Sequence, residues 1–207
     1  MIKRLSRISA IVAGMLALAV WCGAVDFSAT TTTKTGKMTM TGKVYRHGNR
    51  LREDSNLGGT KRAVIVRPDK NVSYVVNFSE KTYMEMLQMP GTNMGKIFDP
   101  ALLKQYGTLK KMGSEKISGF VCDKMRFTPK MKPMGVATYW VSRDLQWPLK
   151  IVNATPGGGS LVMETKDIKI GPVPAALFNL PKGFKKQAMP KMPPPHGTPK
   201  GMPAKPR

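Results

Sequence analysis

A chain of 207 residues, 41% of them hydrophobic, is long enough for one folded domain with its own apolar core. Its two cysteines allow at most one disulfide, which excludes a small scaffold stapled by several disulfides. The formal net charge of +22 at pH 7 is spread along the chain and favours contact with anionic surfaces such as phospholipid head groups.

The first 24 residues have the pattern of a secretory signal peptide. Three basic residues precede a largely apolar run over residues 8–21, which is shorter than the roughly 20 residues of a membrane span. Cleavage near Ala24 predicts an exported, periplasmic protein. The alternative is an envelope protein lipidated on Cys22, although Trp21 stands where such sites carry a small residue. Export makes nucleic acid a poor physiological partner despite the charge, and none is expected.

Loss of the signal peptide leaves Cys122 as the single thiol. It alternates with Phe120 in an expected strand, where a free cysteine behaves as a small hydrophobe. A nucleophilic cysteine needs a base, and the chain offers only His47 and His196. With no phosphate-binding glycine loop, zinc spacing or pair of acids, we expect no enzyme, no catalytic residues and no cofactor.

Methionine is abundant, with 16 residues in the chain, and thioethers are soft ligands for Cu(I). Yet the pairs Met38/Met40 and Met84/Met86 repeat at the period of a strand, which core packing or an adaptable apolar surface explains without a metal. We therefore expect no metal site.

The first half of the exported chain predicts a series of strands, because alternating or β-branched runs are separated by turn-forming residues. These runs are residues 26–33, 37–45, 51–55, 62–67, 72–78 and 81–87. Residues 46–50 and 68–71 provide turns. Within one run, Val72, Tyr74, Val76 and Phe78 fall on the same side.

A short helix is expected next, beginning at Asp99-Pro100 and ending at Gly107, because Asp caps free amides and Pro fits the first helical turn. The second half again predicts strands, over residues 109–116, 118–128, 136–142, 149–154 and 160–170. Residues 143–148 form a turn between two of them. In residues 172–184, four apolar side chains could plug one end of the sheet: Leu177, Phe178, Leu180 and Phe184.

Several segments carry a resemblance to a known family. They are GFVCDKM (119–125), YWVSRDL (139–145) with PLK (148–150), the run 163–170 and FNLPKGF (178–184). In this order, over roughly residues 26–186, they resemble a family of exported bacterial proteins of unknown function that is similar to the periplasmic lipoprotein carriers typified by LolA and LolB. The resemblance implies a mainly β fold, in which a strongly curved, unclosed antiparallel sheet of about ten strands forms a half-barrel with a short helix on its concave side.

These observations divide the chain into three parts. Residues 1–24 are a signal peptide, residues 25–184 a LolA-like β domain, and residues 185–207 a tail rich in proline and lysine. The tail is expected to be disordered, because it cannot bury enough apolar area to offset the loss of chain entropy.

Two functions remain open. In the carriers the concave face holds acyl chains, so the resemblance implies a non-enzymatic envelope protein that binds a lipid, an acyl chain or an apolar protein segment. The candidate ligand-binding residues are Tyr74, Val76, Phe78, Met84, Met86, Phe120 and Trp140. The alternative is a structural or interaction protein without a ligand cavity, attached to an anionic membrane surface by its basic charge.

Overall fold

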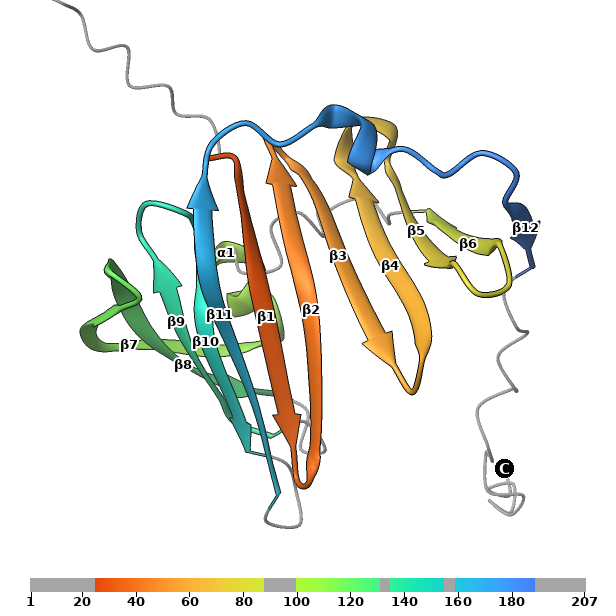
Figure 1. The fold of residues 1–207 in the computed structure, drawn as a ribbon. Coiled ribbons are helices and arrows are strands. Elements are labelled where there is room, and N and C mark those ends of the chain that lie inside the picture. Colours follow the sequence, from red (N-terminus) through yellow and green to blue (C-terminus); the bar gives the residue numbers. More distant parts are fainter. Residues whose placement is uncertain (1–24, 88–99, 131–134, 155–158, 189–207) are drawn as a thin grey trace, which may run out of the picture.

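The computed structural model describes residues 25–87, 100–130, 135–154 and 159–188 (Figure 1). The expected signal peptide with Cys22, the loop that precedes the helix and most of the expected tail lie outside the described residues. No helix among the described residues has the length and apolar character needed to cross a membrane.

One sheet dominates the chain. Its strands are β1 (Phe27–Thr35), β2 (Met38–His47), β3 (Arg50–Leu57), β4 (Thr60–Arg67), β5 (Val72–Asn77), β6 (Thr82–Leu87), β7 (Gly107–Ile117), β8 (Phe120–Pro129), β9 (Ala137–Ser142), β10 (Trp147–Ala154), β11 (Ser160–Ile170) and β12 (Lys185–Gln187). The helical elements between them are short: η1 (Pro68–Lys70), α1 (Pro100–Tyr106) and η3 (Ala175–Phe178).

The 12-stranded sheet consists of two antiparallel meanders joined through its middle. Its order is β12-β6-β5-β4-β3-β2-β1-β11-β10-β9-β8-β7, so β1 and β11 connect the two halves. Only β12 pairs in parallel, with β6, among the described strands. The two ends of this order, β12 and β7, do not pair with each other, and the sheet is therefore unclosed.

The sheet bends strongly, and the contacts across it identify the concave face. The guanidinium of Arg46 in β2 donates a 2.7 Å hydrogen bond to the carbonyl oxygen of Leu145, in the turn between β9 and β10. Val44, Leu51 and Val66 belong to the same buried cluster as Leu145. Since β1 and β11 separate these strands along the sheet, the contacts can form only on the inside of the bend.

The helix α1 lies on the concave face. Its Leu103 lines a cavity together with Met125 of β8 and Tyr139 of β9. These two residues pair with each other, and Tyr139 pairs with Ile151, in a row that continues to Thr33 of β1. Thr33, Thr31 and Ala29 are spaced two residues apart in β1, so they share a face, and Ala29 pairs with Val44. The helix α1 and Val44 therefore lie on the same face of the sheet.

The convex face is covered over β3–β6 by the segment that follows β11, residues 172–184. Ala63, Ile65 and Val76 form a second buried cluster with Val173 and Phe178 of that segment. Around this cluster pack seven partly buried residues: Tyr45, Tyr74, Phe78, Tyr83, Leu177, Leu180 and Phe184. The apolar side chains of residues 177–184 thus cover a face of the sheet, whereas the sequence predicted that they would plug one end of it.

The predicted fold class is confirmed: one large, unclosed, curved sheet with one short helix on its concave side. The differences are local. The described sheet has 12 strands instead of about ten, and β10 begins at Trp147, inside the expected turn. The ordered chain also continues past the expected boundary at Phe184, because Lys185–Gln187 add to the edge of β6.

Candidate functional site

Three of the residues expected to bind a ligand lie on the convex face, under the segment 172–184. Val76 is fully buried, and Tyr74 and Phe78 pack around the same cluster. The ring of Phe78 lies edge-on to Phe184 at 5.6 Å between ring centroids. The contacts of these three side chains are therefore with residues of the segment 172–184.

Met84 and Met86 lie on the opposite, concave face. Met84 pairs with Val75 and Met86 with Ser73, whereas Tyr74 pairs with Glu85, so the two methionines alternate with the convex residues of the same hairpin. Val75 in turn pairs with Val64 of β4. We define the concave apolar patch as Val64, Val75, Met84 and Met86. Its side chains are half-buried, and Val64 is 37% exposed.

One carboxyl group interrupts the apolar row that leads from the core to this patch. Glu53 of β3 pairs with Val44 on one side and with Val64 on the other. Burial raises the pKa of the Glu53 carboxyl above its ordinary value. An ionisable group between two valines therefore makes the charge of the concave face dependent on pH.

The remaining two expected residues lie in the second meander, away from the patch. Phe120 begins β8 and packs against the cluster that contains Leu145. Trp140 pairs with Lys150, which pairs with Glu164 and then with Thr32 on the convex face. Trp140 also belongs to the cluster that contains Leu145, so the structure brings the seven residues to three separate places.

A small cavity of about 130 Å³ lies beneath α1 on the concave face. Its apolar lining consists of Leu103, Leu109, Met125, Tyr139 and Val141, and its polar lining includes Asp123, Arg143 and Gln146. Arg143 donates to Asp123 at 2.7 Å, and Lys111 lies 3.0 Å from the same carboxylate oxygen. Hydrogen bonds from Arg143 and Lys111 lower the pKa of Asp123. An apolar group in the cavity would thus lie next to fixed charges.

The groups with catalytic potential have structural partners. Burial raises the pKa of the Cys122 thiol, and its Sγ lies 3.6 Å from the carbonyl oxygen of Phe120, so the sulfur stays protonated. His47 contacts Asp26 at 2.6 Å between Nδ1 and Oδ2, which ties the start of β1 to the turn after β2. Within the described part of the chain, no three His, Cys, Asp or Glu residues are placed to hold a metal ion.

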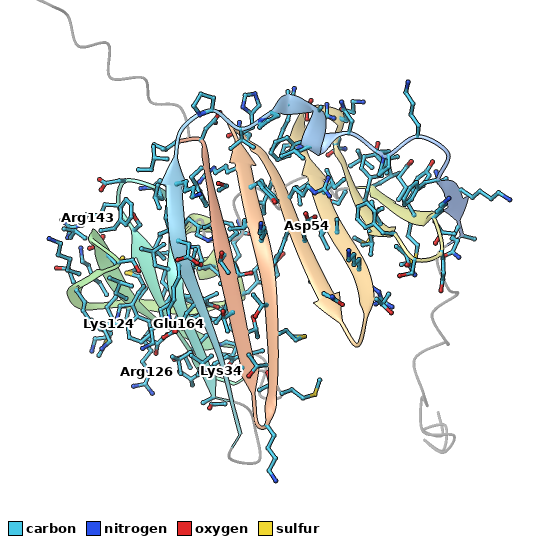
Figure 2. All side chains as sticks on the ribbon, in the orientation of Figure 1. Lys34, Asp54, Lys124, Arg126, Arg143 and Glu164 are labelled. Atoms are coloured by element: carbon cyan, nitrogen blue, oxygen red, sulfur yellow. The ribbon has the colours of Figure 1, made fainter. Side chains whose placement is uncertain are left out.

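Cations and one indole ring gather on the convex face of the second meander. The ammonium groups of Lys124 and Lys150 lie 4.9 and 5.3 Å from the centroid of Trp140, within cation–π range. The indole Nε1 donates to Glu115 at 2.7 Å. Figure 2 shows Lys124, Arg126, Glu164 and Lys34 on this side of the molecule. We call Lys34, Lys124, Arg126, Lys150 and Lys166 the convex lysine patch, although it includes one arginine.

A groove of about 560 Å³ lies over β2, β3 and β4. At one end, Arg52 lies over the ring of Phe78 and donates to the carbonyl oxygen of Leu177. Toward the other end, the lining includes Gly42 and Ser55, the last pair of the ladder between β2 and β3. This groove was not predicted from the sequence. The only signal for it was a run of charged and polar residues, typical of any solvated strand.

Comparison with protein families places residues 22–147 in the family described as "Domain of unknown function (DUF4412)". The comparison with curated proteins gave no match. A family of unknown function is what the sequence predicted.

Among solved structures, an uncharacterised conserved protein from Thermus thermophilus matches at 10% identity and a TM-score of 0.57, over 79% of this chain and 90% of that one. The structure of the Pseudomonas aeruginosa MucA/MucB complex matches at 17% identity and a TM-score of 0.51, over 72% of this chain and 53% of that chain. The present chain therefore spans about half of the matched chain of that complex.

A LolA superfamily protein from Nitrosomonas europaea also matches, at 12% identity and a TM-score of 0.39, over 75% of this chain and 90% of that chain. At these identities, the first two likenesses show a common fold.

Proposed function

The chain belongs to the DUF4412 family, and we propose that it is a non-enzymatic binding protein of the cell envelope that holds an acyl chain or an apolar protein segment on its concave face. The observation that carries this proposal is the concave apolar patch. Val64, Val75, Met84 and Met86 continue the buried core of the concave face outward across three strands, yet remain half-exposed.

The composition of the patch suits a flexible apolar ligand. Methionine side chains are unbranched and polarizable, so they adapt to ligands of different shape. The cavity beneath α1, at about 130 Å³, is smaller than the roughly 300–1,000 Å³ of sites that enclose a drug-sized ligand. It can receive the end of a chain, while the rest lies along the open face.

The experiment uses the purified full-length protein and a fluorescent fatty-acid probe, with native mass spectrometry to detect lipid that copurifies. We expect saturable probe binding that weakens about tenfold in the double variant Met84→Gln/Met86→Gln, because burying unpaired amides against an acyl chain is unfavourable. The matched control is Met38→Gln/Met112→Gln, which changes two methionines that are 59% and 50% exposed, on β2 and β7. Absence of both probe binding and copurified lipid, or equal loss in both double variants, would overturn the proposal.

A second function is favoured by the convex lysine patch: attachment to an anionic membrane surface. Lys34 lies in a row with Arg126, and Glu164 in the neighbouring row with Lys150 and Lys124. A hydrogen bond from Lys166 lowers the pKa of Glu164, and the charges of Lys166, Lys150 and Lys34 lower it further. The five cations of the patch lie around the carboxylates of Glu115 and Glu164. Each cation near an anionic bilayer contributes at most about 1 kcal/mol to the free energy of membrane binding.

Cosedimentation with vesicles distinguishes this second function. We expect binding to phosphatidylglycerol vesicles and none to phosphatidylcholine vesicles, with loss on Lys124→Glu/Lys150→Glu and retention on the control Lys70→Glu/Lys104→Glu, which changes two exposed lysines outside the patch. Binding that ignores lipid charge, or that falls equally in both variants, would contradict a role for this patch.

A further inference from the structure

The sheet contains a fork, and we propose that this fork binds an extended acidic segment of a partner protein, which pairs with β2 as an added strand. We define the fork as the site where β2 and β3 stop pairing, with the groove that lies over it. It is separate from the concave apolar patch and from the convex lysine patch.

The free backbone edge comes from unequal pairing. The ladder between β2 and β3 runs from His47 and Arg50 to Gly42 and Ser55, where it stops. Residues 38–41 of β2 continue to pair with β1 on their other side, and β3 continues to Leu57 in its hairpin with β4. Figure 1 shows β2 and β3 diverging toward the start of β2. Beyond Gly42 the described structure gives this edge of β2 no partner strand, so its alternate N–H and C=O groups can accept one.

Gly42 marks the vertex of the fork. A Cβ atom at this position would meet the backbone carbonyl oxygen of Asp54 and the hydroxyl of Thr31. The absence of a side chain thus lets β2 and β3 approach closely at their last pair, immediately before they separate. The vertex therefore depends on the glycine.

The charge of the groove selects an acidic occupant. Arg52 is paired with Asp54 at 2.7 Å, which leaves this carboxylate neutralised. Lys43, Lys61 and Arg62 also line the groove, are exposed, and form no ion pair with a carboxylate of the described residues. An acidic segment is therefore attracted, whereas a second copy of this chain, with a net charge of +22, is repelled.

The backbone edge selects a polypeptide over other anions. A phosphate or a lipid head group could satisfy the three cations, but it would leave the N–H and C=O groups of residues 38–41 without strand partners. An extended peptide satisfies both, and Tyr45 and Phe78 at the end of the groove offer apolar contact to its side chains.

The experiment measures fluorescence anisotropy of a labelled peptide of alternating Glu and Thr residues with the full-length protein. We expect this peptide to bind, and a peptide of alternating Lys and Thr not to bind. A third peptide has the acidic sequence N-methylated at every second residue, which keeps the charge and blocks strand pairing. It is expected to bind at least tenfold more weakly.

Two charge-matched double variants locate the site. Lys61→Glu/Arg62→Glu is expected to weaken binding of the acidic peptide about tenfold, because two attractions between these cations and the peptide carboxylates become repulsions. Lys116→Glu/Lys169→Glu, on β7 and β11, changes the net charge equally and is expected to leave the affinity within about twofold. Thermal melts confirm that both variants fold.

Three outcomes would overturn the proposal: equal weakening by both double variants, undiminished binding of the N-methylated peptide, or binding of phosphatidylglycerol vesicles or inorganic phosphate at the fork without any binding of the peptide. Binding of the fatty-acid probe to Lys61→Glu/Arg62→Glu is expected to be unchanged. Failure at the fork is thereby distinguishable from failure of the concave apolar patch.

Discussion

Two carboxyl groups of the first meander have pKa values displaced in opposite directions. Arg67 is only 5% exposed and donates to both carboxylate oxygens of Asp69, at 2.9 and 2.7 Å. The same guanidinium donates to the carbonyl oxygen of Phe178. The hydrogen bond from Arg67 lowers the pKa of Asp69 to about 2, whereas burial raises the pKa of Glu53. At neutral pH the ionised Asp69 therefore stabilises the folded protein, whereas the ionised Glu53 destabilises it.

For Asp69→Asn we expect a loss of stability at pH 7 of about 1 kcal/mol, because the Asp69 side chain is 39% exposed and solvent screens the pair. Since the folded pKa lies below the ordinary value near 3.9, the stabilisation is complete above about pH 4 and disappears as the pH falls through 2. Urea unfolding of both proteins at pH 7 and pH 2 measures this. The exposed Asp144→Asn serves as control. A difference that is unchanged at pH 2 would contradict the assignment.

For Glu53→Gln the expected sign is reversed. A carboxyl whose pKa rises on folding binds more protons in the folded state, so its contribution to stability falls as the pH rises through the interval between the two values. The variant should therefore melt at a higher temperature than the parent at pH 7 and at the same temperature at pH 4. Scanning calorimetry at both pH values checks this, and a lower melting temperature at pH 7 would count against a desolvated carboxylate.

Single residues could be predicted from the sequence where only alternation matters. Alternation placed Tyr74 with Val76 and Phe78, and Met84 with Met86, and both groupings are confirmed. It could not place the two groups on opposite faces, because the hairpin register decides which residues pair. Alternation also leaves the face of Trp140 undecided. The sequence prediction therefore grouped Trp140 with Met84 and Met86, although it lies on the other face of the sheet.

Among the elements, the segment 172–184 holds the convex face of the first meander. Phe178 is fully buried between β3–β5 and the ring of His47, whose centroid lies 6.1 Å from that of Phe178. Leu180, in contrast, is only partly buried. The apolar residues of this segment were visible in the sequence, but their position over Ile65 and Val76 depends on tertiary contacts.

For Phe178→Ala we expect a loss of about 3–5 kcal/mol in the free energy of unfolding, since a large buried ring is removed and a cavity remains. Leu180→Ala is the control and should cost less. Urea unfolding with tryptophan fluorescence measures both. Equal losses would mean that Phe178 is not the anchor of the segment.

Register shifts explain why the second meander was harder to predict than the first. Irregularities lie between Lys111 and Gly113, between Pro148 and Lys150, and between Ser28 and Thr30. Each inserts a residue into one strand, so the period-two pattern changes face along the sheet. A sequence pattern shows alternation within a run, whereas it does not show which run contains the extra residue.

On the scale of the whole molecule, positive charge is the dominant electrostatic feature. The net charge of +22 implies repulsion between like charges throughout the folded chain. The same charge protects the exposed edge strand β7, where Lys110, Lys111 and Lys116 and the irregularity before Gly113 oppose pairing with another sheet.

We therefore expect the melting temperature to rise when NaCl is increased from 10 to 300 mM, because the Debye length shortens from about 30 Å to less than 10 Å. The triple variant Lys37→Gln/Lys104→Gln/Lys169→Gln, at three exposed positions, should show a smaller rise. Calorimetry of both proteins across the salt series measures the effect. A melting temperature that falls with salt would mean that ion pairs such as Arg143 with Asp123 outweigh repulsion.

The pairing of β1 with β11 has a consequence for synthesis. The ribosome makes β1 early and β11 near the end, so the first meander emerges with one side of β1 unprotected until Ser160–Ile170 have been translated. A polypeptide released before that point keeps an unpaired strand edge along β1, with free backbone N–H and C=O groups. Chains truncated before β11 are thus expected to aggregate or to be degraded by proteases. The sheet can be completed only after β11 has been translated.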